Sequence, residues 1–203
     1  TKFIMNTWSG IYRREYIEKH HIRHNTTPGA SFQDNGFFWQ TFIYAKRCMF
    51  IDKPYYMNRR DNPNSSVKNK EKVYCMNIEY DFIREIFMQK GNEKLWERFR
   101  PYYTYKKYYS YVFTLGRISS EFTEEYLDRM SREFKRAFDL GEVDLSVFTP
   151  YTQKAIELLV KDPQGYYQRY ILKKGSGPVN ILRRLRRFLG KVKRGIGRRI
   201  KKR

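Results

Sequence analysis

The chain has 203 residues, of which 42 are Lys or Arg and 21 are Asp or Glu, so its formal net charge is +21. This length suits one ordinary domain with an appendage, and a content of 40% hydrophobic residues excludes an intrinsically disordered chain. No apolar run reaches the roughly 18 residues that a membrane-spanning helix needs. Cys48 and Cys75 form neither a disulfide framework nor a zinc-ligand pattern, which favours a reducing compartment.

The positive charge is concentrated near the C-terminal end. Residues 173–203 contain 14 basic residues and no acidic ones, which leaves 28 basic against 21 acidic residues in the rest of the chain. The body is therefore only moderately basic. The first residue is Thr1, and an apolar run follows at once without a signal peptide, so we expect a processed chain or a fragment.

The first segments combine short apolar runs with a turn-rich loop. Residues 3–5 predict the end of a strand. Ser9 is a suitable cap for a helix over 11–19, where apolar side chains fall on one stripe. Residues 25–33 contain a Pro-Gly pair among small polar residues, which predicts a loop.

A second helix is predicted next, starting at Asp34 or Asn35 and ending near Arg47, a basic residue suited to a helix C-terminus. Residues 48–51 are apolar and predict a short buried strand. An extended segment then leads into residues 61–66, whose Asp, Asn, Pro and Ser composition predicts a loop.

The remainder of the body predicts helices only. Apolar residues spaced by three or four positions indicate helices over 68–90, 92–118 and 121–140, and the second is expected to be interrupted near Pro101. A Thr-Pro pair starts a further predicted helix over 150–161.

One carboxylate in the N-terminal third is a candidate for chemistry. Asp34 lies at the predicted loop-to-helix junction, between Gly29 and Gly36. A carboxylate at a helix N-terminus is stabilised by the helix dipole and usually has no other role, so the capping interpretation is favoured over a catalytic base. Three aromatic residues follow it: Phe37, Phe38 and Trp39.

Three motifs occur in a fixed order: WSGIYRR at 8–14, the dipeptide Gln33-Asp34 followed by aromatic residues, and Tyr-Tyr-x-x-Arg-Arg at 55–60. As a set, over about residues 3–70, they resemble the acceptor-side half of a family 2 glycosyltransferase of the GT-A fold. The helical region 68–172 resembles the extension that many such enzymes carry.

The resemblance implies transfer of a sugar, with inversion, from a nucleotide diphosphate donor to an acceptor hydroxyl. It assigns Asp34 the role of general base, which removes the acceptor proton. The preceding position is commonly Glu in that family and is Gln33 here, an uncharged residue that can still orient the acceptor by hydrogen bonding.

The resemblance also implies a substrate-binding set. Trp39 would line the sugar site and Trp8 would lie near the substrates, although core packing is an equally good explanation for Trp8. Arg59 and Arg60 would lie near the donor diphosphate, because paired guanidinium groups suit phosphate. A solvated basic turn is the alternative for this pair.

The family's donor site departs most from this sequence. That site is built by an N-terminal region with an Asp-x-Asp motif that holds Mg²⁺ or Mn²⁺, and no Asp-x-Asp occurs in this chain. We therefore expect Mg²⁺ or Mn²⁺ in the complete enzyme, none bound by this chain, and no transfer by this chain alone.

Two other groupings have ordinary explanations. His20 and His24 have i,i+4 spacing, but no third and fourth zinc ligands are apparent, so these histidines and His21 are expected on the surface. Residues 102–113 alternate aromatic and basic side chains, as single-stranded nucleic-acid binders do. The helical spacing of Tyr105, with Tyr109, Val112 and Gly116, instead favours packing against neighbouring helices.

The C-terminal tail predicts a basic amphipathic helix. Its apolar residues trace one helical stripe among Lys, Arg and Gly, which is typical of a helix that lies in the interface of an anionic membrane. Binding to nucleic acid is the less favoured alternative, because an apolar stripe has no use on phosphate. The residues proposed to contact the membrane are Arg183, Arg184, Leu185, Phe188 and Leu189.

The sequence as a whole predicts an α+β chain that is mostly helical. Residues 1–67 would form the C-terminal part of a GT-A domain, 68–174 a helical extension and 175–203 the basic tail. The expected function is sugar transfer from a nucleotide-sugar to a glycan or lipid-linked acceptor, at the cytoplasmic face of the cell membrane. A non-catalytic module that binds membrane or nucleic acid is the alternative, with Asp34 as a helix cap.

Overall fold

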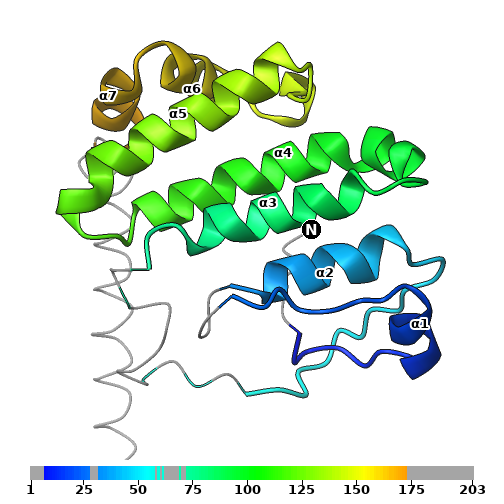
Figure 1. Ribbon diagram of the computed structural model, residues 1–203. Coiled ribbons are helices and arrows are strands. Elements are labelled where there is room, and N and C mark those ends of the chain that lie inside the picture. Colours follow the sequence, from blue (N-terminus) through cyan, green and yellow to red (C-terminus); the bar gives the residue numbers. More distant parts are fainter. Residues whose placement is uncertain are drawn as a thin grey trace, which may run out of the picture. The chain divides into compact units, whose positions relative to one another are not determined.

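The computed structural model is shown in Figure 1. It describes residues 7–27, 32–57, 59, 61, 69 and 72–172. These residues are mostly helical, and no β-strand occurs among them. The chain divides into two compact units, one ending at Thr149 and the other beginning at Pro150.

The first unit opens with two short helices. Helix α1 spans Arg14–Lys19, later than the predicted start at residue 11, because Arg13 has extended backbone angles (φ −67°, ψ 125°). Helix α2 spans Asp34–Ile43: it begins where the sequence predicted but ends before the predicted Arg47, because residues 44–47 are not helical. The predicted strand at 3–5 lies outside the described residues.

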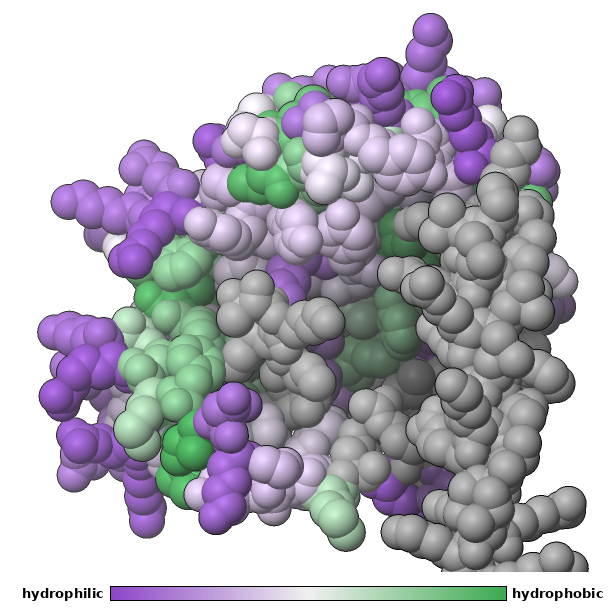
Figure 2. All heavy atoms as spheres, turned by 180° about the vertical axis from the view of Figure 1, so that it is seen from behind, coloured by the Kyte–Doolittle hydropathy of each residue, from purple (hydrophilic) through white to green (hydrophobic). Residues whose placement is uncertain are grey.

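The predicted buried strand at 48–51 is wrong. The side chains of Met49, Phe50 and Ile51 are 83%, 65% and 60% exposed, and the segment forms no ladder. A strand is stable only when a neighbouring strand takes up its main-chain hydrogen bonds, and the described residues contain no such neighbour. These side chains contribute to the apolar surface of the first unit, and Figure 2 shows apolar patches interrupting a hydrophilic surface.

Three long helices form the rest of the first unit. Helix α3 spans Cys75–Phe87, α4 spans Glu93–Leu115 and α5 spans Thr123–Asp139. Helix α3 packs against both α2 and α4, and α4 packs against α5 (Figure 1). Helix α3 is shorter than the predicted 68–90, because residues 72–74 are not helical and the helix ends at Phe87. Helix α5 ends next to the predicted residue 140, and Gly141 follows with φ 65°, a conformation that suits glycine after a helix. Short 3₁₀ turns, η2 and η3, lie at Ser120–Phe122 and Leu145–Val147.

The predicted interruption of the second long helix is also wrong. Helix α4 continues through Pro101 without a break. A proline removes a single main-chain donor, and the helix is held by packing on both sides of it. Trp96 before the proline and Tyr103 after it both contact Phe87 of α3, with ring centroids 5.4 and 6.2 Å apart.

The core of the first unit is rich in tyrosine. Tyr103 and Tyr111 of α4 are 3% and 0% exposed, so the Tyr-rich segment packs on its neighbours as the sequence favoured. The buried stripe is not the predicted one, because Tyr109 is 37% exposed. The largest core side chains include Trp39, Tyr80, Phe87, Tyr103, Tyr111, Tyr126 and Phe134.

The second unit begins with α6, which spans Pro150–Lys161 as predicted. Asp162 then caps helix α7 (Pro163–Tyr166), its Oδ1 atom accepting a hydrogen bond of 2.8 Å from the Gly165 main-chain N–H. The chain continues into a π-helical turn, η4, at Tyr167–Leu172. The predicted amphipathic tail lies outside the described residues.

Candidate functional site

Asp34 is the first residue of α2 and is half-buried. Burial raises the pKa of its carboxyl group, while the main-chain N–H groups of Asp34 and Asn35 and the charge of His24 act in the opposite direction. The Asn35 side-chain amide donates to Asp34 Oδ1 at 3.3 Å and to the Phe32 carbonyl at 2.9 Å. The carboxylate therefore lies at a helix N-terminus in a partly desolvated position.

The chain enters α2 through a strained residue. Phe32 has φ 68°, in the left-handed region that bulky residues rarely adopt, at a cost on the order of 1–3 kcal/mol. Its carbonyl accepts the Asn35 main-chain N–H at 3.0 Å, and the Arg117 guanidinium lies 4.9 Å from its ring centroid. Such strain persists only where the surrounding contacts maintain it, and it is often found at functional sites.

Gln33 has a structural partner in this arrangement. Its side-chain amide donates to the Thr27 carbonyl at 3.0 Å and to the Thr27 hydroxyl at 2.9 Å. These two bonds join the chain on either side of residues 28–31. The Gln33 amide, which the sequence assigned to an acceptor, is thus engaged by Thr27 in this structure.

A second carboxylate, Glu79 of α3, meets the same helix end. Glu79 is 0% exposed; its Oε1 atom accepts the Gly36 main-chain N–H at 2.7 Å and its Oε2 atom accepts the Asn25 side-chain amide at 3.2 Å. Burial raises its pKa to about 7; the two hydrogen bonds lower it and the nearby charge of Asp34 raises it further. A carboxyl group with a pKa near neutrality can exchange protons at physiological pH.

Glu79 is not among the residues predicted from the sequence, although a signal for it exists. The residue falls on the apolar stripe of α3, three positions after Met76 and four before Ile83, both of which are buried. A carboxylate on the buried face of a helix needs a partner, and the partner here is the N-terminus of α2.

The segment before the site is fixed to α2 by a pair of hydrogen bonds. The Gln40 side chain accepts the Arg23 main-chain N–H at 3.1 Å and donates to the Arg23 carbonyl at 2.7 Å. His24 follows, with its ring stacked on Phe37 at 4.6 Å and its Nδ1 atom 3.3 Å from the Gln33 carbonyl. His24 is thereby placed beside Asp34.

The described residues contain no group of three or more His, Cys, Asp or Glu side chains that could hold a metal ion. His20 stacks on Tyr44 with centroids 4.7 Å apart, and His24 stacks on Phe37. Both histidines act as aromatic packing groups in this unit.

Each of the other described residues in the predicted substrate-binding set has a structural neighbour of its own. Trp39 is 4% exposed and packs edge-on against Phe87 at 5.7 Å, so in this unit it is a core residue. Trp8 is 47% exposed, and its ring centroid lies 6.1 Å from that of Tyr56. Arg59 is exposed and pairs with Asp61 at 2.9 Å. The predicted residues Arg60, Arg183, Arg184, Leu185, Phe188 and Leu189 lie outside the described part of the chain.

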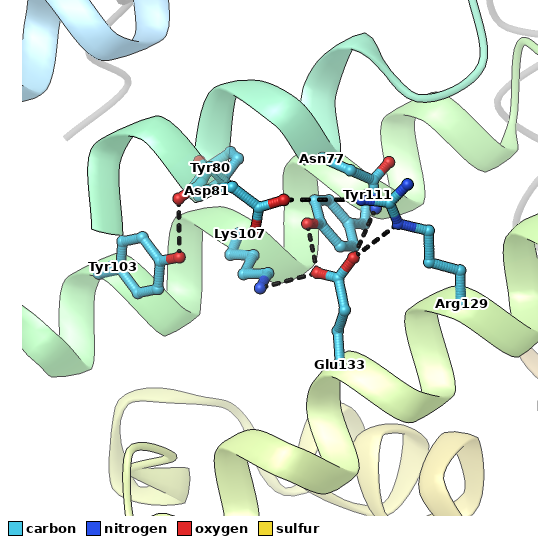
Figure 3. Close-up of polar contacts among 8 residues, drawn as sticks. All are labelled: Asn77, Tyr80, Asp81, Tyr103, Lys107, Tyr111, Arg129 and Glu133. Atoms are coloured by element: carbon cyan, nitrogen blue, oxygen red, sulfur yellow. Dashed lines mark hydrogen bonds and ion pairs between the residues drawn. The ribbon is translucent and has the colours of Figure 1, made fainter. Parts of the chain in front are cut away.

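A separate polar cluster lies between α3, α4 and α5 (Figure 3). The Glu133 carboxylate receives hydrogen bonds or ion pairs from Lys107 (2.8 Å), Tyr111 (2.6 Å), Arg129 (2.9 Å) and Asn77 (3.1 Å). Burial by itself raises its pKa, but the Lys107 charge and these hydrogen bonds outweigh burial, so its pKa is lowered. This carboxylate is stably ionised, and all of its strong acceptor positions are used.

A pocket of about 470 Å³ lies beside this cluster in the first unit. Its charged walls are largely paired with one another: Arg84 binds Glu142 at 2.6 Å and Lys107 binds Glu133 at 2.8 Å. These pairs give the pocket a structural explanation, which leaves the end of α2 as the better candidate site.

Comparisons with models of known protein families, with curated proteins and with solved structures find no match. None of the helices in the described part of the chain combines the length and apolarity of a membrane span. The candidate function therefore depends on the site itself, which presents a half-buried carboxylate, Asp34, beside a fully buried one, Glu79, at one helix N-terminus.

Proposed function

We propose that this chain is the acceptor-side part of an inverting, nucleotide-sugar-dependent glycosyltransferase, with Asp34 as its general base. The observation that carries this proposal is the setting of Asp34, a half-buried carboxylate of raised pKa at the N-terminus of α2. A carboxylate of raised pKa accepts a proton more readily than an exposed one, provided that it is still ionised at working pH.

The proposed step is a single displacement. The Asp34 carboxylate takes the proton of an acceptor hydroxyl, and the hydroxyl oxygen forms a bond to the anomeric carbon of the donor sugar. The bond from that carbon to the nucleoside diphosphate breaks, and the diphosphate leaves with the bonding electron pair. Asp34 ends the step protonated and returns its proton to solvent.

The donor diphosphate has one candidate partner among the described residues. Arg59 is exposed and pairs with the equally exposed Asp61, so a diphosphate can displace that carboxylate from the guanidinium. The Mg²⁺ or Mn²⁺ expected for the complete enzyme finds no ligand group in the described part of the chain, and no step is assigned to it.

The test is the variant Asp34→Asn in the full reading frame that encodes this chain, assayed for transfer from labelled nucleotide-sugars. Loss of the base should lower turnover at least 100-fold and leave donor binding nearly intact. Asp52→Asn, an exposed carboxylate of the same unit, is the matched control and should behave as the wild type. Turnover retained in Asp34→Asn would remove Asp34 from the mechanism.

The composition of the tail supports a second property, attachment to an anionic membrane surface at the cytoplasmic face. Residues 173–203 hold 14 basic residues and no acidic ones, and each cation contributes on the order of 1 kcal/mol near such a surface. The chain with and without residues 178–203 should be compared on vesicles with anionic lipid and on a single-stranded oligonucleotide. Binding to vesicles that depends on the tail supports the proposal, whereas binding to the oligonucleotide alone assigns the tail to nucleic acid.

A further inference from the structure

Glu79 connects three segments that are far apart in the sequence. One of its carboxylate oxygens accepts the main-chain N–H of Gly36 at 2.7 Å, in the first turn of α2. The other accepts the side-chain amide of Asn25 at 3.2 Å, in the segment that precedes the helix. Glu79 itself belongs to α3 and is fully buried.

We propose that Glu79 is a positioning residue for Asp34, which fixes the first turn of α2 and places a second carboxylate behind the proposed base. This inference rests on the proposed function only where catalysis is concerned. The positioning itself is a property of the fold and can be measured without an assay.

The geometry at Gly36 supports a dedicated contact. A Cβ atom on this residue would overlap with Glu79 Oε1 and would lie 2.9 Å from ring carbons of Phe82. The close approach of the carboxylate to the helix main chain is therefore possible only with glycine at this position. Because Gly36 is two residues after Asp34, the same contact sets the direction in which the Asp34 side chain projects from the N-terminus of α2.

The charges around the cluster make Glu79 responsive to Asp34. The titratable groups that face Glu79 are Asp34 of α2 and Tyr80 of α3, and His24 faces Asp34 from the preceding segment. Two carboxylates that share one helix N-terminus repel each other when both are ionised. Ionisation of Glu79 therefore makes Asp34 a stronger base, without Glu79 touching the substrate.

The first experiment needs no activity. Carboxyl-carbon NMR of the full chain should show Glu79 titrating near neutral pH, and Asp34→Asn should lower that midpoint by about half a pH unit or more, because the nearby negative charge is removed. In Glu79→Gln, which retains an acceptor oxygen, the Gly36 amide should keep its protection against hydrogen exchange. In Glu79→Ala its protection factor should fall at least tenfold. An unmoved midpoint together with unchanged protection would overturn the proposal.

The second experiment uses the transferase assay. Glu79→Gln should keep kcat within several-fold of the wild type and flatten its pH dependence around neutrality, whereas Glu79→Ala should lower kcat with little change in KM. Glu85→Gln, an exposed carboxylate on the same helix, is the control. If Asp34→Asn is inactive while both Glu79 variants match the wild type, the positioning role of Glu79 is overturned and the proposed function stands. If Asp34→Asn remains active, the proposed function fails, and the NMR results still decide whether Glu79 positions Asp34.

Discussion

Glu79 of α3 and Glu133 of α5 both have carboxyl groups removed from solvent, and their pKa values move in opposite directions. Glu79 has two uncharged donors and a negative neighbour, so burial prevails and its pKa rises to about 7. Glu133 has Lys107 and Arg129 as partners, and its pKa is lowered despite its burial. The first group is able to exchange a proton near neutrality, whereas the second remains ionised and serves as a fixed link between helices.

The structural role of Glu133 predicts a large loss of stability on truncation. Glu133→Ala removes the ion-pair partner of Lys107, whose side chain is only 13% exposed, while Arg129 keeps Asp81 at 3.5 Å. Leaving the Lys107 charge unpaired should lower the free energy of unfolding by about 3 kcal/mol, measured by urea denaturation. Asp128→Ala, an exposed site on the same helix, should change it by no more than about 0.5 kcal/mol. Equal losses in the two variants would mean that the Glu133 cluster is not a stabilising link.

Gly36 provides a prediction that depends on space rather than charge. Gly36→Ala places a methyl group against Glu79 and Phe82, so we expect a loss of about 1–3 kcal/mol in the free energy of unfolding. Gly116→Ala is the matched control: its Cβ would lie 3.5 Å from the nearest atom, an ordinary contact, and the substitution should be neutral or slightly stabilising. Thermal unfolding of both variants checks the difference, and a stabilised Gly36→Ala would contradict the close contact.

The candidate site was only half predictable from the sequence. Asp34 can be found by its local pattern, because loop chemistry, helix start and carboxylate lie within a few residues of one another. Glu79 cannot be found in this way, since its partner Gly36 lies 43 residues away and only tertiary packing brings the two together. Trp39 illustrates the same limit: the resemblance assigns it to a sugar site, which stays a prediction, while its packing against Phe87 of α3 depends on tertiary structure that local sequence does not contain.

At the scale of elements, the sequence predicted helices better than extended segments. The end of α5 before Gly141 and the whole of α6 follow from local turn and cap chemistry. The predicted strand at 48–51 failed because strand formation depends on a partner that local sequence does not contain. Pro101 was misjudged for a related reason, since the cost of a proline is local but the packing that outweighs it is not.

Pro101 leads to a prediction at this scale. Pro101→Ala restores a main-chain donor inside α4 and removes a steric clash, which together should raise the free energy of unfolding by about 1–2 kcal/mol. Pro150 occupies the first position of α6, where proline is well suited, so Pro150→Ala should be neutral or destabilising by up to about 1 kcal/mol. Circular dichroism during thermal unfolding compares the two. A destabilised Pro101→Ala would show that the proline ring itself contributes to packing.

At the scale of the whole molecule, the net charge of +21 and the buried carboxyl group of Glu79 have opposing effects on the dependence of stability on pH. Acidification increases the positive charge and favours expansion through self-repulsion. It also protonates Glu79, which stabilises the folded state, because the raised pKa means that the folded chain binds this proton more tightly than the unfolded chain does. The pH dependence of the free energy of unfolding contains both effects, so only a comparison between variants separates the contribution of Glu79.

Glu79→Gln should separate the two effects. In the wild type, the contribution of Glu79 is fully present below its unfolded pKa of about 4.5 and is lost as pH rises through the folded pKa of about 7, a loss on the order of 3 kcal/mol. The variant has no proton to lose at this position, so its free energy of unfolding relative to the wild type should increase between pH 4.5 and 7 and stay level above. Urea unfolding at half-unit pH intervals measures this difference, with Glu85→Gln as the exposed control on α3. If the difference in free energy of unfolding between variant and wild type does not change with pH, Glu79 is ionised in the folded chain throughout this range. Its protonation state could then not influence Asp34 near neutral pH.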